Sequence, residues 1–233
     1  MSEFRFTRPN RFPPVIKNLI IINVLVFIAQ STFGAGSHKI ENLFALHDIH
    51  SIYFKPHQLL THMFMHGGLT HLLFNMLALW MFGSVLENHW GGKRFLQFYL
   101  LSGLGAAVLH LTVLYFEMEP IVNMVKMLPA HQQLEYIDSP LYKVNIATVG
   151  ASGAVFGCLA AFGYLFPNSL IYLYFLFPIK AKWFVILYGA LELSLAIQNS
   201  AGDNVAHFAH LGGAITGFII VLFWNKTNRN TLY

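Results

Sequence analysis

Three short stretches of this 233-residue chain place polar side chains with catalytic potential inside apolar sequence. They are Gly150-Ala151-Ser152-Gly153, a segment with His71 and Asn75, and a segment with His207 and His210. A serine hydroxyl becomes a nucleophile when an imidazole takes its proton, and the oxyanion that follows needs hydrogen-bond donors. Since His71 and Asn75 are four residues apart, they share one helical face and can donate toward the same point. These residue types indicate acyl transfer by a serine nucleophile.

The elements that must position these residues are membrane helices. Hydrophobic residues make up 56% of the chain and charged residues 10%, against about 25% charged in soluble domains. Hydrocarbon offers no partner for free backbone amides, and the apolar runs lack the alternation of barrel strands. Runs of about 20 residues, the length that crosses a bilayer, lie near 17–34, 68–86, 95–116, 147–166, 182–200 and 205–224. We predict an all-α polytopic bundle of six transmembrane helices.

The remaining segments complete a single membrane domain over 17–225, with a cytoplasmic N-terminus at 1–16 and a cytoplasmic tail at 226–233. No A-x-A cleavage site follows the first apolar run, so we expect that run to be a retained span and not a signal peptide. The run 170–177 is too short to cross and is predicted as an interfacial or re-entrant piece. The stretch 117–146 is predicted as an outer loop, with a short surface helix over 121–134. Cys158 is the one cysteine, which excludes a disulfide framework.

The distribution of lysine and arginine predicts the orientation. Six spans put both termini on one side, and that side holds ten of the fourteen basic residues. The positive-inside rule therefore places both termini in the cytoplasm, and it explains the net charge of +4 without a nucleic-acid partner. Helices two, four and six then begin on the outer side. Ser152, His71, Asn75 and the two histidines His207 and His210 are expected at one depth, where buried polar groups must face each other or water.

Three motifs in order resemble the rhomboid family of intramembrane serine proteases, in its bacterial six-helix form. They are His71-Leu72-Leu73-Phe74-Asn75, Gly150-Ala151-Ser152-Gly153, and Ala209-His210-Leu211-Gly212-Gly213-Ala214-Ile215-Thr216-Gly217. Gly83, Glu87 and Gly91 also match the family's pattern at the end of helix two. The resemblance implies a serine endopeptidase that cleaves transmembrane protein substrates in the lipid bilayer, without a metal or organic cofactor.

The resemblance also implies roles for single residues. The family pattern places glycines three and seven residues after the base, which selects His210, followed by Gly213 and Gly217, over His207. Ser152 and His210 would form a dyad, with His207 a neighbour that tunes or hydrates the site. The motif holds no acid to orient the base, and Asp203, outside the motif, is a candidate for that third group. His71, Asn75 and the Ser152 backbone amide would form the oxyanion hole. Gly150 and Gly153 are supporting residues. Independently of the resemblance, the position of Glu192 in an apolar run favours a hydrogen-bonded structural role over catalysis.

Three other interpretations stay open at this point. The glycines around Ser152 are also typical of a small-residue helix contact, and Asn75 of interhelical hydrogen bonding. His62, His66 and His71 can belong to a histidine-liganded metal site, since imidazole binds zinc and copper. A rhomboid-like protein can also bind and route membrane clients without cleaving them. We expect a bacterial inner membrane location, with the active site toward the outer side.

Overall fold

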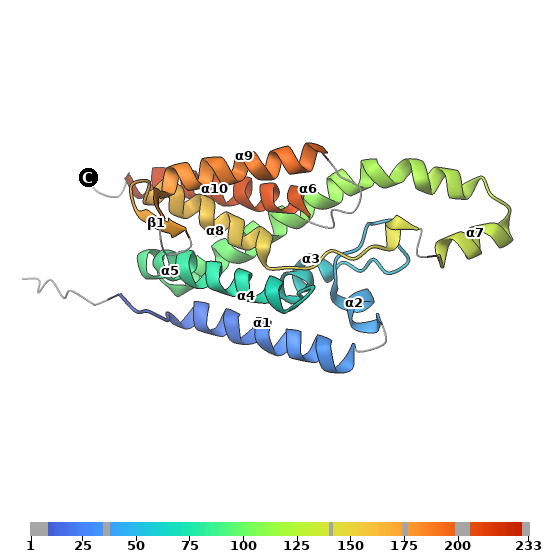
Figure 1. Ribbon diagram of the computed structural model, residues 1–233, viewed down its shortest axis with the longest axis horizontal. Helices are drawn as coiled ribbons and strands as arrows, with labels where there is room; N and C mark the ends of the chain where they lie inside the picture. Colours follow the sequence, from blue (N-terminus) through green and yellow to red (C-terminus); the bar gives the residue numbers. More distant parts are fainter. Residues whose placement is uncertain (1–8, 35–37, 140–141, 174–176, 199–205, 230–233) are drawn as a thin grey trace, which may run out of the picture.

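The computed structural model describes residues 9–34, 38–139, 142–173, 177–198 and 206–229, and Figure 1 shows them as a bundle of helices with one long extension. The bundle helices are α1 (Pro14–Phe33), α4 (Leu69–Ala78), η2 (Leu79–Gly83), α5 (Ser84–Trp90), α6 (Gly92–Lys126), α8 (Ser152–Leu165), α9 (Ala181–Gln198) and α10 (His207–Arg229). The shorter helices are α2 (Lys39–Phe44), α3 (Gln58–Thr61), η1 (His62–Phe64), α7 (Ala130–Ile137) and η3 (Lys143–Asn145). The predicted all-α membrane bundle is confirmed.

Five stretches of the described chain are helical, long and apolar enough to cross a membrane. They are Pro14–Phe33, Leu69–Trp90, Gly92–Lys126, Ala181–Gln198 and His207–Lys226. The fourth predicted span differs, because α8 has 14 residues and a length of only about 21 Å. It begins at Ser152 and not at 147, since Gly150 has φ +138° and the chain before Ser152 is not helical. The shortened helix places Ser152 in its first turn.

Helix α8 forms the centre of the bundle, with α9 and α10 on one side and α4 and α1 on the other (Figure 1). All eleven residues from 153 to 163 are buried, so the helix has no outward face. A helix that is apolar all round belongs in the core of a large bundle. The surface of the outer helices is apolar instead, with Leu25 of α1 and Leu187 of α9 both well exposed. An outward apolar surface of this kind fits contact with lipid.

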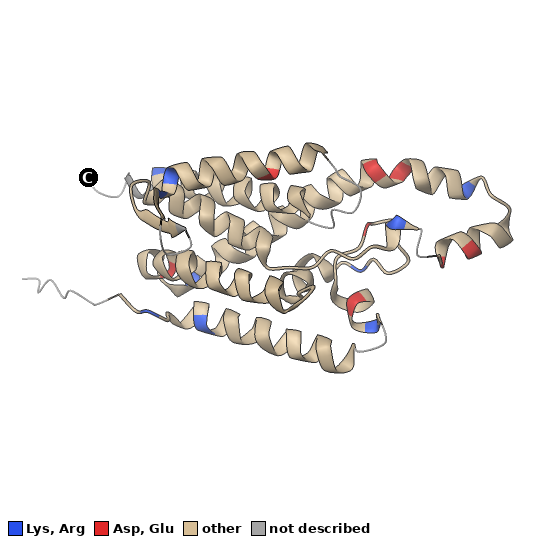
Figure 2. Ribbon diagram, viewed as in Figure 1, with Lys and Arg blue, Asp and Glu red and all other residues tan. Residues whose placement is uncertain are grey.

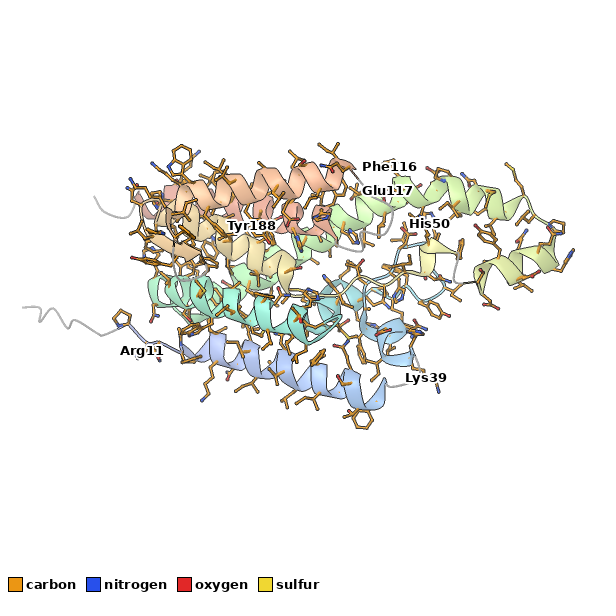
Figure 3. All side chains as sticks on the ribbon, in the orientation of Figure 1. Arg11, Lys39, His50, Phe116, Glu117 and Tyr188 are labelled. Atoms are coloured by element: carbon orange, nitrogen blue, oxygen red, sulfur yellow. The ribbon has the colours of Figure 1, made fainter. Side chains whose placement is uncertain are left out.

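The predicted outer loop 117–146 is largely helical. Helix α6 continues through Pro120 to Lys126, and the separate helix α7 follows, so the surface helix predicted over 121–134 is wrong in its bounds. This extension has its own small core, in which Val122 and Val125 of α6 pack with Tyr142 and Val144. Burial of these side chains explains why the helix continues past the bundle. In Figure 3 the labelled Phe116 and Glu117 mark where α6 leaves the bundle.

The run 170–177 is part of a pair of short strands. Strands β1 (Leu170–Leu173) and β2 (Phe177–Lys180) are antiparallel, with Leu170 opposite Lys180 and Leu173 opposite Phe177. The expectation of a single interfacial or re-entrant piece missed this pairing. Pairing satisfies the backbone groups of a segment that is too short to form a spanning helix. The strands lie at the end of the bundle where α10 ends (Figure 1).

Glu87 illustrates how the other end of helix two is held. Its carboxylate accepts hydrogen bonds from the backbone amides of Val15 (3.0 Å) and Ile16 (2.8 Å), and so caps the start of α1. A carboxylate is favourable at a helix N-terminus, where the amides are free and the dipole is positive. Arg94 instead lies over the ring of Trp224, at 4.6 Å. Glu87 therefore serves as a cap for α1, and Arg94 is placed elsewhere.

Charged residues gather at the ends of the bundle and in the extension, as Figure 2 shows. The interior of the bundle is nearly free of charge, with an acidic segment partway along α9. The acid in that helix is Glu192, and its side chain is buried. An ionisable residue inside a membrane helix is costly, and such residues concentrate at functional sites.

Candidate active site

Ser152 and His210 face each other across the contact between α8 and α10. The Ser152 Oγ and the His210 Nε2 are 2.9 Å apart, which is hydrogen-bond distance. Both residues lie in the first turn of their helices, which begin at Ser152 and His207. In this geometry a neutral His210 with its proton on Nδ1 accepts the serine proton at Nε2.

Two aromatic rings support the histidine. The ring of Phe156 stacks on His210 with centroids 4.3 Å apart and planes 8° apart, and Tyr188 of α9 packs against Phe156 at 5.0 Å. Figure 3 shows the labelled Tyr188 between α9 and α8. The stack fixes the plane in which the His210 nitrogens point. Sequence reasoning missed Phe156, although its place four residues after Ser152 puts it on the serine's helical face.

Glycines allow α8 and α10 to come this close. An added Cβ at Gly217 would lie 2.7 Å from the Cα of Gly157, and one at Gly213 would overlap the Gly153 backbone. Small residues let membrane helices approach to backbone contact. Gly153, Gly213 and Gly217 therefore lie where α8 and α10 approach most closely, near Ser152 and His210.

His71 and Asn75 of α4 lie on the other side of the serine. The backbone amide of Gly67 donates to the His71 Nδ1 at 3.3 Å, so the proton of the neutral ring is on Nε2. That nitrogen is turned toward Gly150, where an added Cβ would lie 3.0 Å from it and 3.4 Å from the Ser152 Oγ. The Asn75 Nδ2 donates to the His71 carbonyl at 3.0 Å. The His71 Nε2 and the Ser152 Oγ thus face the same space beside Gly150.

These four side chains line one cavity of about 570 Å³. Its volume lies in the usual range for ligand sites, and a few polar groups among apolar walls are typical of such sites. The apolar part comes from side chains of four helical elements: Phe74, Ala78, Phe82, Val155, Phe156, Leu159, Phe184 and Tyr188. The cavity is therefore suited to an apolar segment that presents a carbonyl group to Ser152.

His207 and His210 share one hydrogen-bond partner, the carboxylate of Glu192. The Nδ1 of His207 is 2.7 Å from the Glu192 Oε2, and the Nδ1 of His210 is 2.9 Å from the same oxygen. The structure brings His210, and not His207, to the serine hydroxyl. Glu192 has the predicted hydrogen bonds, but both of its partners belong to the histidine pair, which the sequence did not reveal. Asp203, the other acid considered beside His210, lies outside the described residues.

The group with potential to hold a metal ion also differs from the prediction. Within the described ranges, donor atoms of Glu192, His207 and His210 all lie within 4.8 Å of one another, whereas His62, His66 and His71 form no such group. Two imidazoles and a carboxylate are ligands that zinc accepts. The hydrogen bonds described above already join these three side chains, however, and they account for the geometry without an ion.

The two histidines just before α4 are held neutral. Burial is the main cause that lowers the pKa of His62 and of His66, each to about 4. The His62 Nδ1 is 2.8 Å from the carbonyl oxygen of Gln58, and its own carbonyl accepts the Gly150 amide at 3.0 Å. The ring of His66 meets that of His71 edge to face at 5.2 Å. These residues therefore shape the segment that carries the serine.

Comparison with known proteins agrees with this architecture. The family model of the rhomboid domain matches residues 53–226. The chain is 30% identical over 161 residues to the rhomboid protease GluP of Bacillus subtilis, covering 69% of this chain and 24% of that protein. It is 32% identical over 167 residues to the rhomboid protease AarA of Providencia stuartii, covering 68% of this chain and 52% of that protein.

A mitochondrial relative extends the comparison beyond bacteria. Rhomboid protein 1 of Saccharomyces cerevisiae is 30% identical over 163 residues, which cover 70% of this chain and 40% of that protein. In each of these comparisons the match spans less than two thirds of the relative. The matched family model runs from before α4 to residue 226 in the last turns of α10, and it includes every residue of the cavity wall described above. The chain is therefore an integral membrane protein and belongs to the rhomboid family.

Proposed function

We propose that this chain is an intramembrane serine endopeptidase in which Ser152 is the nucleophile and His210 the general base. The observation that carries the proposal is the 2.9 Å contact between the Ser152 Oγ and the His210 Nε2 at an apolar cavity. A nucleophile within hydrogen-bond distance of its base is the arrangement that activates a hydroxyl group. The similarity to relatives named as proteases supports the same chemistry.

The first chemical step forms the acyl-enzyme. The Ser152 oxygen attacks the scissile carbonyl carbon while its proton passes to the His210 Nε2. The negative charge on the carbonyl oxygen is stabilised by the His71 Nε2–H, the Asn75 amide and the backbone amide of Ser152, aided by the N-terminal dipole of α8. His210 then gives its proton to the leaving amine, and the peptide bond breaks.

The second step releases the product. Water loses a proton to His210 and attacks the acyl carbon, and the Ser152 oxygen leaves with that proton. Each proton that His210 accepts is returned within the same half of the reaction. The chain needs no metal and no organic cofactor in this scheme.

The substrates are transmembrane segments of other membrane proteins. The apolar wall of the cavity includes Phe82, Phe184 and Tyr188. These side chains suit the apolar side chains of a segment that enters from the bilayer. A helical segment hides its carbonyl groups in its own hydrogen bonds, so the substrate must unwind locally before Ser152 reaches it. Segments with small or helix-breaking residues near the scissile bond are the preferred class.

The protein is located in a bacterial inner membrane with both termini in the cytoplasm. The excess of lysine and arginine at one end of the bundle supports this orientation. Ser152 and His210 then lie toward the outer side, where water is available for the second step. Reporter fusions at the two termini and in α7 test the orientation, and an externally accessible terminus would contradict it.

Cleavage of a panel of transmembrane reporters tests the activity, with the cleavage sites mapped by mass spectrometry. We expect Ser152→Ala and His210→Ala to lower turnover by at least about 10⁴-fold, with the fold retained. His207→Ala is the matched variant, because that histidine does not contact the serine, and it should keep measurable turnover. Loss with His207→Ala together with retention in His210→Ala would refute the assignment of the base.

A fluorophosphonate probe provides an independent measurement, because it labels an activated serine covalently. Labelling in wild type that disappears in Ser152→Ala supports the nucleophile. If Ser152→Ala cleaves reporters as wild type does, serine catalysis by this site is wrong. A chain that binds reporters but never cleaves them would instead be a client-binding relative of the proteases.

A further inference from the structure

Glu192 is a buried acid within a helix that is predicted to span the membrane. Its side chain is 4% exposed, and it lies in α9, which is apolar enough to cross the bilayer. A carboxylate in such a position is costly unless it is paired and hydrogen-bonded. Glu87, with the same exposed fraction, offsets that cost by capping α1. The cost of burying Glu192 must likewise be offset by the groups that it bonds to.

Those partners are the two histidines of α10. The Glu192 Oε2 lies 2.9 Å from the His210 Nδ1, while the opposite nitrogen of the same ring lies 2.9 Å from the Ser152 Oγ. A continuous line of hydrogen bonds thus runs from α9 through α10 to α8. The His207 Nδ1, at 2.7 Å from the same oxygen, is a second donor. Two donors on one oxygen hold the carboxylate in place.

The direction of these hydrogen bonds has a chemical consequence. A carboxylate is an acceptor only, so the His210 Nδ1 must carry the proton in the resting state. The Nε2 is then left without a proton and can accept one from the serine. Without the acceptor, the other tautomer becomes accessible, in which Nε2–H faces the hydroxyl and cannot take its proton. The carboxylate also opposes the positive charge that His210 gains during attack, in surroundings of low dielectric.

We propose that Glu192 is a positioning residue for the reaction, so that Ser152, His210 and Glu192 act as a unit of three across three membrane helices. This inference rests on the proposed protease function. Glu192 acts through His210 and does not touch the substrate, and the proton stays on the imidazole throughout. His207 orients the carboxylate by occupying the same oxygen. The sequence motifs that contain Ser152 and His210 do not include the third group, because it comes from α9.

The variant Glu192→Gln tests the proposal, since it keeps the size and shape of the side chain and removes the charge. Glu87→Gln is the matched control, because it neutralises an equally buried carboxylate that is remote from the cavity. We expect Glu192→Gln to lower kcat by about 10² to 10⁴-fold, with KM within about 3-fold of wild type. The rate of fluorophosphonate labelling at Ser152 should fall in parallel. Glu87→Gln should leave both rates unchanged and shift thermal unfolding at least as much.

The alternative is that Glu192 only stabilises the packing of α9 against α10. A structural tie changes unfolding temperature but leaves the kcat and the labelling rate of the folded enzyme near those of wild type. Glu192→Gln with kcat within about 3-fold of wild type therefore overturns the inference, while a dead Ser152→Ala in the same assay leaves the protease function standing. An active Ser152→Ala would instead refute serine catalysis at Ser152, on which the inference rests.

A second variant and a chelator treatment complete the test. If Glu192→Gln does not fold, Glu192→Asp retains the charge and withdraws it from His210 by one methylene group, about 1.5 Å. This variant should lose at least about 10-fold in kcat, and wild-type turnover overturns the inference. Treatment of the wild-type enzyme with EDTA should leave turnover unchanged. Loss of turnover that Zn²⁺ restores would overturn the proposal in favour of a metal site on these three side chains.

Discussion

Replacement of Gly217 by alanine tests whether the spacing of α8 and α10 sets the reaction geometry. The new Cβ would lie 2.7 Å from the Gly157 Cα and 2.8 Å from the Gly157 carbonyl oxygen, whereas ordinary contact begins at 3.4 Å. Both neighbours are backbone atoms and cannot rotate away. The helices must therefore separate locally by about 0.7 Å, since packed interiors have no free space to absorb a methyl group.

The separation of the two helices also moves His210 away from Ser152. His210 lies seven residues from Gly217, or about 10 Å along α10. If the helix moves as a rigid body, the 2.9 Å contact between His210 and Ser152 lengthens to about 3.6 Å, beyond hydrogen-bond distance. A displacement of this order costs about 10²-fold in kcat, or about 2.7 kcal/mol of transition-state stabilisation. Overpacking also lowers the free energy of unfolding by about 1–3 kcal/mol.

Gly189→Ala is the control, because among the described residues no atom outside its own helix lies within 4 Å of an added Cβ there. We expect that variant to cleave a transmembrane reporter within about 2-fold of wild type, since nothing needs to move. Reporter turnover and the fluorophosphonate labelling rate should both fall in Gly217→Ala at a temperature where both proteins are folded. Equal turnover in the two folded variants would refute the argument that backbone contact between α8 and α10 holds the pair.

Two other predictions concern the segment around the serine. Gly150→Ala combines a backbone at φ +138° with a Cβ 2.9 Å from the His71 ring, so we expect about 1–3 kcal/mol of destabilisation and a lower kcat from a displaced oxyanion donor; kcat equal to wild type would contradict this. Burial lowers the pKa of His62 from 6.5 to about 4, so the folded state binds fewer protons than the unfolded state between these values. The contribution of the neutral His62 to the free energy of unfolding is therefore fully present above pH 6.5. Up to about 3 kcal/mol of it is lost as the pH falls toward 4, and denaturant unfolding in micelles measures this loss. His62→Gln should weaken this dependence, and an unchanged slope would count against it.

The sequence predicted the helical bundle but not the ends of its elements. Spans follow from hydropathy because a membrane requires long apolar helices, and this rule holds for α1, α6 and α9. It failed at α8, where the backbone at Gly150, with φ +138°, is not helical and the helix starts five residues late. It also failed beyond residue 117, where a local core extends α6, and at β1 and β2, where strand pairing satisfies a run too short to cross.

What the sequence determined by itself was which candidate groups share a helical face. The spacing of His71 and Asn75, the glycines around Ser152 and those after His210 are local patterns, and helical periodicity turns them into faces. Only the tertiary structure decided which groups touch. The stack of Phe156 on His210, the turn of His71 toward Gly150 and the approach of Glu192 depend on how α4, α8, α9 and α10 rotate about their axes. That rotation is set by packing between helices far apart in the chain, and for this reason Glu192 looked like an isolated acid until α9 and α10 were placed together.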